Sequence, residues 1–138
     1  MATLNRRNKM TNNWNKDMVI ERFEEAVGTL RRWHVPGIKP KGHFSAWPDI
    51  VYTVWEIEMQ DKLPVRLGSP SASAIDRMNE TFSWLWHLER VDERKVIVMK
   101  ARKMRWKSIL PVLGCGRTHG WEIYQNALEK IVTKLNNN

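Results

Sequence analysis

Cysteine is nearly absent from this sequence, with Cys115 as its one instance in 138 residues. A single cysteine excludes an internal disulfide framework and makes a reducing cytoplasm the expected location. No apolar run approaches the roughly 18 residues that a bilayer crossing needs, and no signal-peptide pattern opens the chain. We therefore expect a cytoplasmic protein that does not engage a membrane.

Residue patterns that mark nucleotide or metal chemistry are missing as well. The sequence has no Walker-type glycine loop and no CxxC pair. The four histidines are scattered without metal-ligand spacing: His34, His43, His87 and His119. Because the common nucleotide-binding and metal-binding motifs are missing, we expect no cofactor and no metal site.

Acidic residues on two predicted helices are the remaining candidates for catalysis. One cluster has the chemistry to hold Mg²⁺ and consists of Asp49, Glu56, Glu58 and Asp61. Asp76 and Glu80 lie at i and i+4, where a general acid and base pair would also need a cleft and a partner histidine. A solvated or arginine-paired helix face is the simpler interpretation of both clusters. We therefore expect no enzymatic activity.

Apolar residues recur every three or four positions along most of the chain, a spacing that predicts an all-α fold. Asn15 or Asp17 caps a first predicted helix, which ends by His34. Three further helices are predicted at residues 47–60, 70–88 and 92–104. Asp92 is the expected N-cap of the last of these.

This pattern divides the chain into three parts. Residues 1–13 are polar and basic, and we expect a mobile basic arm there. Residues 14–90 form a predicted helical scaffold, and residues 91–138 a predicted helix-turn-helix unit that packs with it into one body of five or six helices. Eight tryptophans supply large core anchors. Five of them fall in apolar periodic segments: Trp33, Trp47, Trp55, Trp84 and Trp86.

The helix-turn-helix prediction begins with Gly114-Cys115-Gly116, which separates two helical patterns at a point where glycine can take the positive φ of a tight turn. Before the turn, three residues face inward: Ile109, Leu110 and Leu113. After it, one apolar stripe contains Ile123, Ala127, Leu128, Ile131, Val132 and Leu135. Gly120 is expected where the second helix presses closely on its partner.

Positive charge is concentrated in this C-terminal part. From Asp92 onward, ten Lys or Arg face four Asp or Glu, which is +6 of the chain's net +8. A pI near 9.9 favours polyanionic partners. A helix of about 10–12 Å diameter fits the major groove of B-DNA, and a short preceding helix can brace it across the backbone. The sequence therefore predicts a double-stranded DNA-binding unit.

In such a unit the first two turns of the second helix meet base edges, while neighbouring cations neutralise phosphates. The predicted base-contacting residues are Arg117, Thr118, His119, Trp121, Glu122 and Gln125. The predicted phosphate-contacting residues are Arg102, Lys103, Arg105, Lys107 and Gly116.

Other interpretations of these residues stay open. Arg117 could instead pair with Glu122, and His119 could be a plain surface residue. Trp121 could pack on the N-terminal body. Trp106 and Trp121 are also the two tryptophans interleaved with basic residues, the arrangement that a base-stacking platform for single strands needs.

The stretch from Glu93 to Leu135 resembles region 4 of bacterial sigma factors and related helix-turn-helix regulators. The similar features are an opening Glu93-Arg94, the Leu113-Gly114 before the turn, the Gly116-Arg117-Thr118 start of the recognition helix and the tail from Asn126 to Ile131. Two positions depart from the pattern, since Leu110 replaces a small residue and Pro111 falls within the second helix. No sigma region 2 is present, which excludes a complete sigma factor.

Most of the chain also resembles an uncharacterised helix-turn-helix family of alphaproteobacterial chromosomes and prophages. The shared steps are Trp47-Pro48, Ala74 to Glu80, and Trp84 to Trp86. The resemblance implies a regulator of transcription, and a phage terminase small subunit-like packaging protein is the alternative. A third reading is an interaction module that never touches nucleic acid. The N-terminal helices are left to scaffold the unit, to form a homo-oligomer, or to contact a protein such as RNA polymerase.

Overall fold

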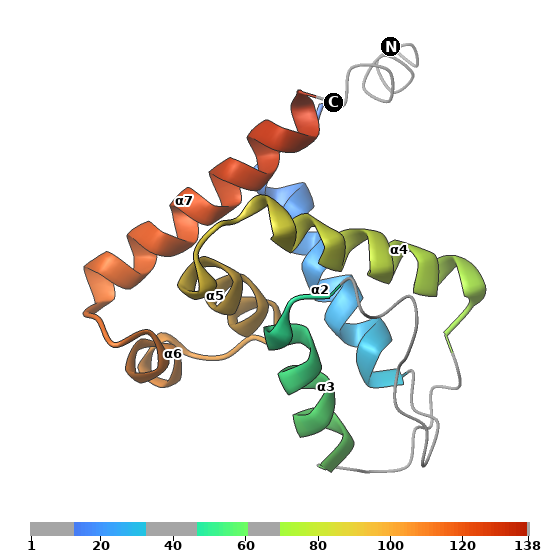
Figure 1. Cartoon of the computed structure of the whole chain (residues 1–138), viewed down its shortest axis with the longest axis horizontal. Helices are drawn as coiled ribbons and strands as arrows, with labels where there is room; N and C mark the ends of the chain where they lie inside the picture. The colour runs from blue at the N-terminus through green and yellow to red at the C-terminus, as the bar shows by residue number, and fades with distance from the viewer. Residues whose placement is uncertain (1–12, 33–46, 61–69, 138) are drawn as a thin grey trace.

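The computed structural model describes residues 13–32, 47–60 and 70–137, and within them the chain is helical (Figure 1). The elements are α2 (Lys16–Arg32), α3 (Asp49–Gln60), α4 (Ala72–Ser83), a 3-10 helix η2 (Trp84–His87), α5 (Val91–Ala101), α6 (Trp106–Leu113) and α7 (Arg117–Asn136). The predicted all-α fold is confirmed. Residues 1–12 of the predicted arm and Trp33 lie outside the described residues.

Helix α2 lies at the centre of the fold and contacts α4, α5 and α7 (Figure 1). Asn15 caps it, because the Asn15 Oδ1 atom accepts a hydrogen bond of 2.9 Å from the Met18 N–H. Asp17 sits in the first turn, where a carboxylate favours the helix dipole. The apolar stripe that the sequence predicts is buried: Val19, Phe23, Ala26, Val27 and Leu30.

The predicted helix 70–88 divides into α4 and η2. Ser71 caps α4, since its hydroxyl accepts a 3.1 Å hydrogen bond from the Ala74 N–H. From Trp84 the backbone tightens into a 3-10 turn, which has about three residues per turn and so shifts the phase of the side chains. Trp84 stays in the core, but Trp86 is 49% exposed beneath the Arg94 guanidinium, which lies 4.8 Å from the ring centroid. The prediction that Trp86 is a core anchor is therefore wrong. Trp47 is buried as predicted.

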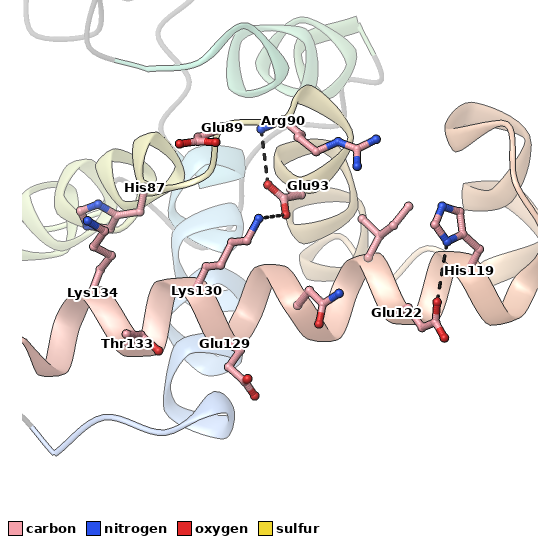
Figure 2. Close-up of a pocket in the computed structure, with 12 residues that line it drawn as sticks. His87, Glu89, Arg90, Glu93, His119, Glu122, Glu129, Lys130, Thr133 and Lys134 are labelled. Atoms are coloured by element: carbon pink, nitrogen blue, oxygen red, sulfur yellow. Dashed lines mark hydrogen bonds and ion pairs between the residues drawn. The ribbon is translucent and has the colours of Figure 1, made fainter.

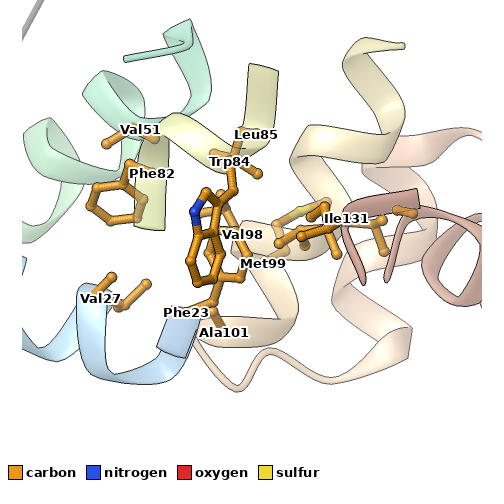
Figure 3. Close-up of a cluster of buried hydrophobic side chains, with 14 of the residues drawn as sticks. Phe23, Val27, Val51, Phe82, Trp84, Leu85, Val98, Met99, Ala101 and Ile131 are labelled. Carbon is orange, nitrogen blue, oxygen red and sulfur yellow. The ribbon is translucent and has the colours of Figure 1, made fainter. Parts of the chain in front are cut away.

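Buried apolar side chains from every α-helix join in one core (Figure 3). Phe23 from α2, Phe82 from α4 and Ile131 from α7 belong to the same cluster. The N-terminal helices and the C-terminal unit therefore share their interior, which fixes α7 against the rest of the molecule. None of the described helices combines the length and apolar character that a bilayer crossing requires.

The start of α2 and the end of α7 are tied together. The Asn136 side chain accepts a 2.7 Å hydrogen bond from the Trp14 N–H and donates one of 3.0 Å to the Trp14 carbonyl. The Trp14 ring packs edge-on against Trp84, with centroids 5.1 Å apart. The Arg22 guanidinium lies over both rings and donates to the Glu80 carboxylate. Glu80 is thus paired with an arginine, and the same network joins both ends of the described fold.

The three C-terminal helices differ from the prediction at one helix. Arg90, not Asp92, is the N-cap of α5, because the Glu93 carboxylate reaches back to accept from the Arg90 N–H at 3.4 Å. The helix also ends at Ala101 instead of Met104, since Lys103 takes a left-handed backbone conformation with φ of 65°. The helix predicted at residues 92–104 is therefore shorter and begins one residue before Asp92.

Helices α6 and α7 meet across the predicted glycine turn. Gly114 has a φ of 71° and ends α6, and Gly116 is the N-cap of α7. Pro111 lies inside α6 without dividing it. A Cβ atom on Gly120 would lie 2.6 Å from the Leu110 Cδ2 atom, so the predicted close approach of the two helices at Gly120 is confirmed.

Candidate nucleic-acid interface

The first two turns of α7 are open to solvent. Arg117, Thr118, His119, Trp121 and Glu122 are exposed, and Gly120 alone faces inward, against α6. The buried side chains of the helix run from Ile123 to Leu135. The N-terminal half of the protein therefore holds the body of α7 and leaves its opening turns uncovered.

A hollow of about 630 Å³ lies beside these turns, where α5 ends and α6 and α7 begin. We call it the basic hollow. Its lining includes five cationic residues: Lys100, Lys103, Arg105, Lys107 and Arg117. The rest of the lining is Glu24, Met104, Trp106 and Tyr124. One carboxylate against five cations makes this surface strongly attractive to polyanions.

Local backbone geometry explains why these cations gather. The left-handed turn at Lys103 ends α5 and brings the chain round to Arg105, the N-cap of α6. Arg117 is the first residue of α7. In the described part of the chain no side chain caps α7 at Gly116, so the first N–H groups of the helix stay available to an anion beside Arg117.

Two of the three lysines of the hollow contact neighbouring side chains. The Lys103 Nζ atom lies 3.8 Å from the Glu24 Oε2 atom, and Lys100 places its ammonium 5.1 Å from the centroid of the Trp106 ring. Glu24 comes from α2, so the N-terminal half contributes the one carboxylate of this surface. Lys103 remains largely exposed in spite of the ion pair.

Tyr124 forms part of the inner wall of the basic hollow and is only 7% exposed. Burial, and then the negative charge of Glu24, raise the pKa of the Tyr124 hydroxyl to about 12. The ring packs edge-on against Trp106, with centroids 6.0 Å apart. Tyr124 therefore keeps its proton far above neutral pH, and its ring gives the wall of the hollow a rigid aromatic surface.

We expect the Tyr124 hydroxyl to titrate well above the usual pKa of 10, near 12. Because the folded state keeps this proton longer than the unfolded state, the stabilisation is present below pH 10 and is lost as the pH rises toward 12. Ultraviolet absorbance of tyrosinate in the folded protein would follow the step, and Tyr124→Phe should remove it. Glu24→Gln should lower the pKa. A late step that survives in Tyr124→Phe would assign it to Tyr52, the other tyrosine of the chain.

A second hollow, of about 620 Å³, lies along α7 and faces η2 and the start of α5 (Figure 2). Its charges are mixed. Glu93 is 4% exposed and accepts a 2.6 Å hydrogen bond from the Lys130 ammonium. Burial, and then the nearby Lys134 charge, lower the pKa of His87. Its lining has four carboxylates (Glu89, Glu93, Glu122 and Glu129) and three Lys or Arg (Arg90, Lys130 and Lys134), so this surface attracts a polyanion far less than the basic hollow does.

Three of the six predicted base-contacting residues line these two hollows. Arg117 lines the basic hollow, whereas His119 and Glu122 line the second hollow, with His119 Nδ1 3.8 Å from Glu122 Oε1 (Figure 2). Glu122 thus lies next to His119 on its own helix, and no ion pair joins it to Arg117 in the described part of the chain. Gln125 is half-buried, and its side-chain oxygen accepts a 3.0 Å hydrogen bond from Lys16. A base contact by Gln125 would require that bond to break.

Trp121 packs within the C-terminal unit, not on the N-terminal body. Its ring meets Trp106 and Tyr124 edge-on, at centroid distances of 6.2 Å in both cases. Among the predicted phosphate contacts, Lys103, Arg105 and Lys107 line the basic hollow. Arg102 does not line it, since it is half-buried with Nη1 at 3.8 Å from the Met104 sulfur.

Three charged or polar residues of the basic hollow were not predicted from the sequence: Glu24, Lys100 and Tyr124. Lys100 carried a signal, because it lies three positions before Lys103 in a basic stretch. Tyr124 lies three residues after Trp121 on the same helix, within reach of one aromatic cluster. Glu24 gave no signal, since only the packing of α2 against the C-terminal unit brings it there.

The described residues form no obvious metal centre. Within residues 13–32, 47–60 and 70–137, no group of three or more His, Cys, Asp or Glu is placed to hold a metal ion. From the acidic face of α3, Asp49 and Glu56 are exposed, while Asp61 and the side chain of Glu58 lie outside the description.

Comparison with known proteins gives one match. No curated protein and no solved structure matches the chain. The family described as "Domain of unknown function (DUF6362)" matches residues 33–131, a range that takes in α3 to α6 and most of α7. That range includes all of the basic hollow except Glu24. Because the match spans more than two thirds of the sequence, the chain belongs to the DUF6362 family.

Proposed function

We propose that this protein binds double-stranded DNA through α6 and α7 and regulates transcription in a bacterium or prophage. One observation carries the proposal: five lysines and arginines line a hollow at the exposed start of α7. Phosphate neutralisation by such side chains supplies most of the affinity of a DNA-binding protein. Recognition by this surface needs no cofactor and no catalytic group.

The arrangement of the two helices suits a major groove. The first turns of α7 project from the body with Thr118 and Glu122 on the exposed side and Trp121 on its flank. Arg105 and Lys107, at the start of α6, lie beside them across the basic hollow. A groove-bound α7 would thus have phosphate contacts along the α6 side, while Arg117 reaches either a phosphate or a guanine edge.

The shared core gives the N-terminal helices a role in this proposal. Ile131 and Leu128 anchor α7 in the interior, and α2 and η2 pack against it, so they hold the recognition helix at a fixed angle. A rigid support of this kind reduces the entropy lost when the helix enters a groove. We propose that the N-terminal half is the scaffold for the DNA-binding surface.

The direct test is the salt dependence of binding to a labelled duplex of mixed sequence. From about 50 to about 200 mM salt, the logarithm of the association constant should fall with a slope of roughly −3.6, because four of the five cations each release about 0.9 counterion while Lys103 pairs with Glu24. Binding that is absent, or that barely changes with salt, would overturn the proposal and favour a protein interaction module. Selection from a random DNA pool would then identify preferred bases. Light scattering on the complex would separate a regulator from a packaging ring of many copies.

Glu24 should oppose this binding, because it is the one carboxylate in the basic hollow. Glu24→Gln is expected to tighten duplex binding up to about eightfold at about 0.1 M salt and to steepen the salt slope by about 0.9. Fluorescence anisotropy of the labelled duplex would measure both. Glu21→Gln is the matched control, since Glu21 lies on the same helix outside the hollow. Equal gains in the two variants would assign the effect to net charge alone.

A further inference from the structure

Three aromatic rings lie together where α6 crosses α7. Trp106, Trp121 and Tyr124 meet edge-on in all three pairings, with centroid distances of 6.0 to 6.2 Å. Gly120 permits this close packing of α6 on α7, because a Cβ atom there would lie 2.6 Å from the Leu110 Cδ2 atom, beside Trp106. The glycine therefore lets one indole from α6 settle over the helix that carries the other two rings.

The three rings differ in how they meet solvent. Tyr124 is buried, and the Lys100 ammonium lies over the Trp106 ring. Trp121, in contrast, is 50% exposed. Edge-on contacts with Trp106 and Tyr124 hold the Trp121 ring, while half of the side chain stays open to solvent. Trp121 thus offers an immobilised, exposed indole surface next to the wall of the basic hollow.

An exposed indole is poorly matched to an intact duplex. In the major groove the bases present polar edges, and the thymine methyl group is the one apolar contact available. The faces of the bases are hidden in the stack. A base that has left the stack shows its face, and stacking of that face on an aromatic side chain contributes regardless of base identity.

Cations stand at the right place to hold the backbone of such a base. Arg117 lies one turn before Trp121 on α7, and the basic hollow continues from it to Arg105 and Lys107. Trp106 belongs both to the lining of the hollow and to the aromatic cluster. Ring surface and phosphate-binding cations therefore adjoin one another.

From this juxtaposition we infer that the protein also binds single-stranded DNA, with an unpaired base stacked on Trp121 and its flanking phosphates in the basic hollow. The inference rests on the proposed function for its cations, but it adds a ligand that needs no duplex. Stacking makes the preference one for unpaired bases, so the protein would favour frayed, bubbled or single-stranded segments next to its duplex site.

The test uses the full chain and an oligothymidylate of about 12 nucleotides, within the site sizes of known single-strand binders. Trp121→Ala should weaken binding roughly 5- to 150-fold, and Trp121→Phe should restore most of it. Trp86→Ala is the matched control, because Trp86 is equally exposed but lies outside the hollow. Thermal unfolding of each variant verifies that the fold is intact.

An abasic oligonucleotide of the same length isolates the stacking contact. It keeps the phosphates and lacks the bases, so wild type and Trp121→Ala should bind it equally. If Trp121→Ala weakens abasic and thymidylate binding alike, the indole does not stack on a base and the inference fails. Salt-sensitive duplex binding without any thymidylate binding overturns the inference and leaves the proposed function standing. Loss of both ligands in the wild type overturns the two together.

Discussion

Replacing Arg105, Lys107 and Arg117 together by alanine is expected to weaken binding to a mixed-sequence duplex on the order of 500-fold at about 0.1 M salt. The three side chains line the basic hollow from α6 and α7. If each contacts one phosphate, the variant releases about 2.7 fewer counterions, and its salt slope becomes shallower by the same amount. Anisotropy titrations at several salt concentrations would measure both quantities.

A second triple variant controls for net charge. Arg31, Arg32 and Arg77 line a hollow at the C-terminal end of α2 and the start of α4, away from α7 (Figure 1). Their replacement by alanine removes the same three charges and should change the duplex affinity far less. If both triple variants lose affinity equally, binding is a property of overall charge and the basic hollow is not the DNA-binding surface.

Phe82→Ala is expected to lower the free energy of unfolding by about 3–5 kcal/mol. Phe82 belongs to the buried cluster of Figure 3 and is 0% exposed. Its ring lies edge-on against Trp47, with centroids 5.2 Å apart. Removal of the ring leaves a cavity that neighbouring side chains fill only in part. Chemical denaturation followed by circular dichroism would give the loss, and Phe82→Leu should recover a large part of it.

The same experiment examines the coupling between the two halves of the molecule. Because Phe82 and Ile131 belong to one core, the variant should unfold in a single transition, with circular dichroism and tryptophan fluorescence giving the same midpoint. DNA binding should be lost in that same transition. A C-terminal unit that stays folded and binds DNA after the N-terminal helices have melted would contradict a shared interior.

The helices were largely predictable from the sequence, because apolar spacing reports which side of a helix is buried. The stripe from Val19 to Leu30 and the stripe from Ile123 to Leu135 are both found where the pattern puts them. Trp86 was not predictable in the same way. Its position depends on the 3-10 helix that begins at Trp84. That helix has four residues, too few for the spacing of apolar residues to show the change from an α-helix.

The basic hollow was predictable in part, because some of its residues are close together in the sequence and others are far apart. Arg105, Lys107 and Arg117 belong to consecutive elements, so a short turn was enough to bring them together. Glu24 and the Lys16–Gln125 hydrogen bond connect residues far apart in the chain and depend on how α2 packs. His119 lies on the other flank from Arg117 because two residues correspond to about 200° of rotation around an α-helix, so this separation was predictable from the sequence.

The hydrogen bonds between Trp14 and Asn136 have a practical consequence for anyone handling this protein. Helix α7 has 20 residues and is therefore about 30 Å long, so this junction lies that far from Arg117. A dye, an affinity handle or a tether to a sensor chip, attached beside the junction, would point away from incoming oligonucleotides. One labelling position thus serves every titration described above without crowding the ligand.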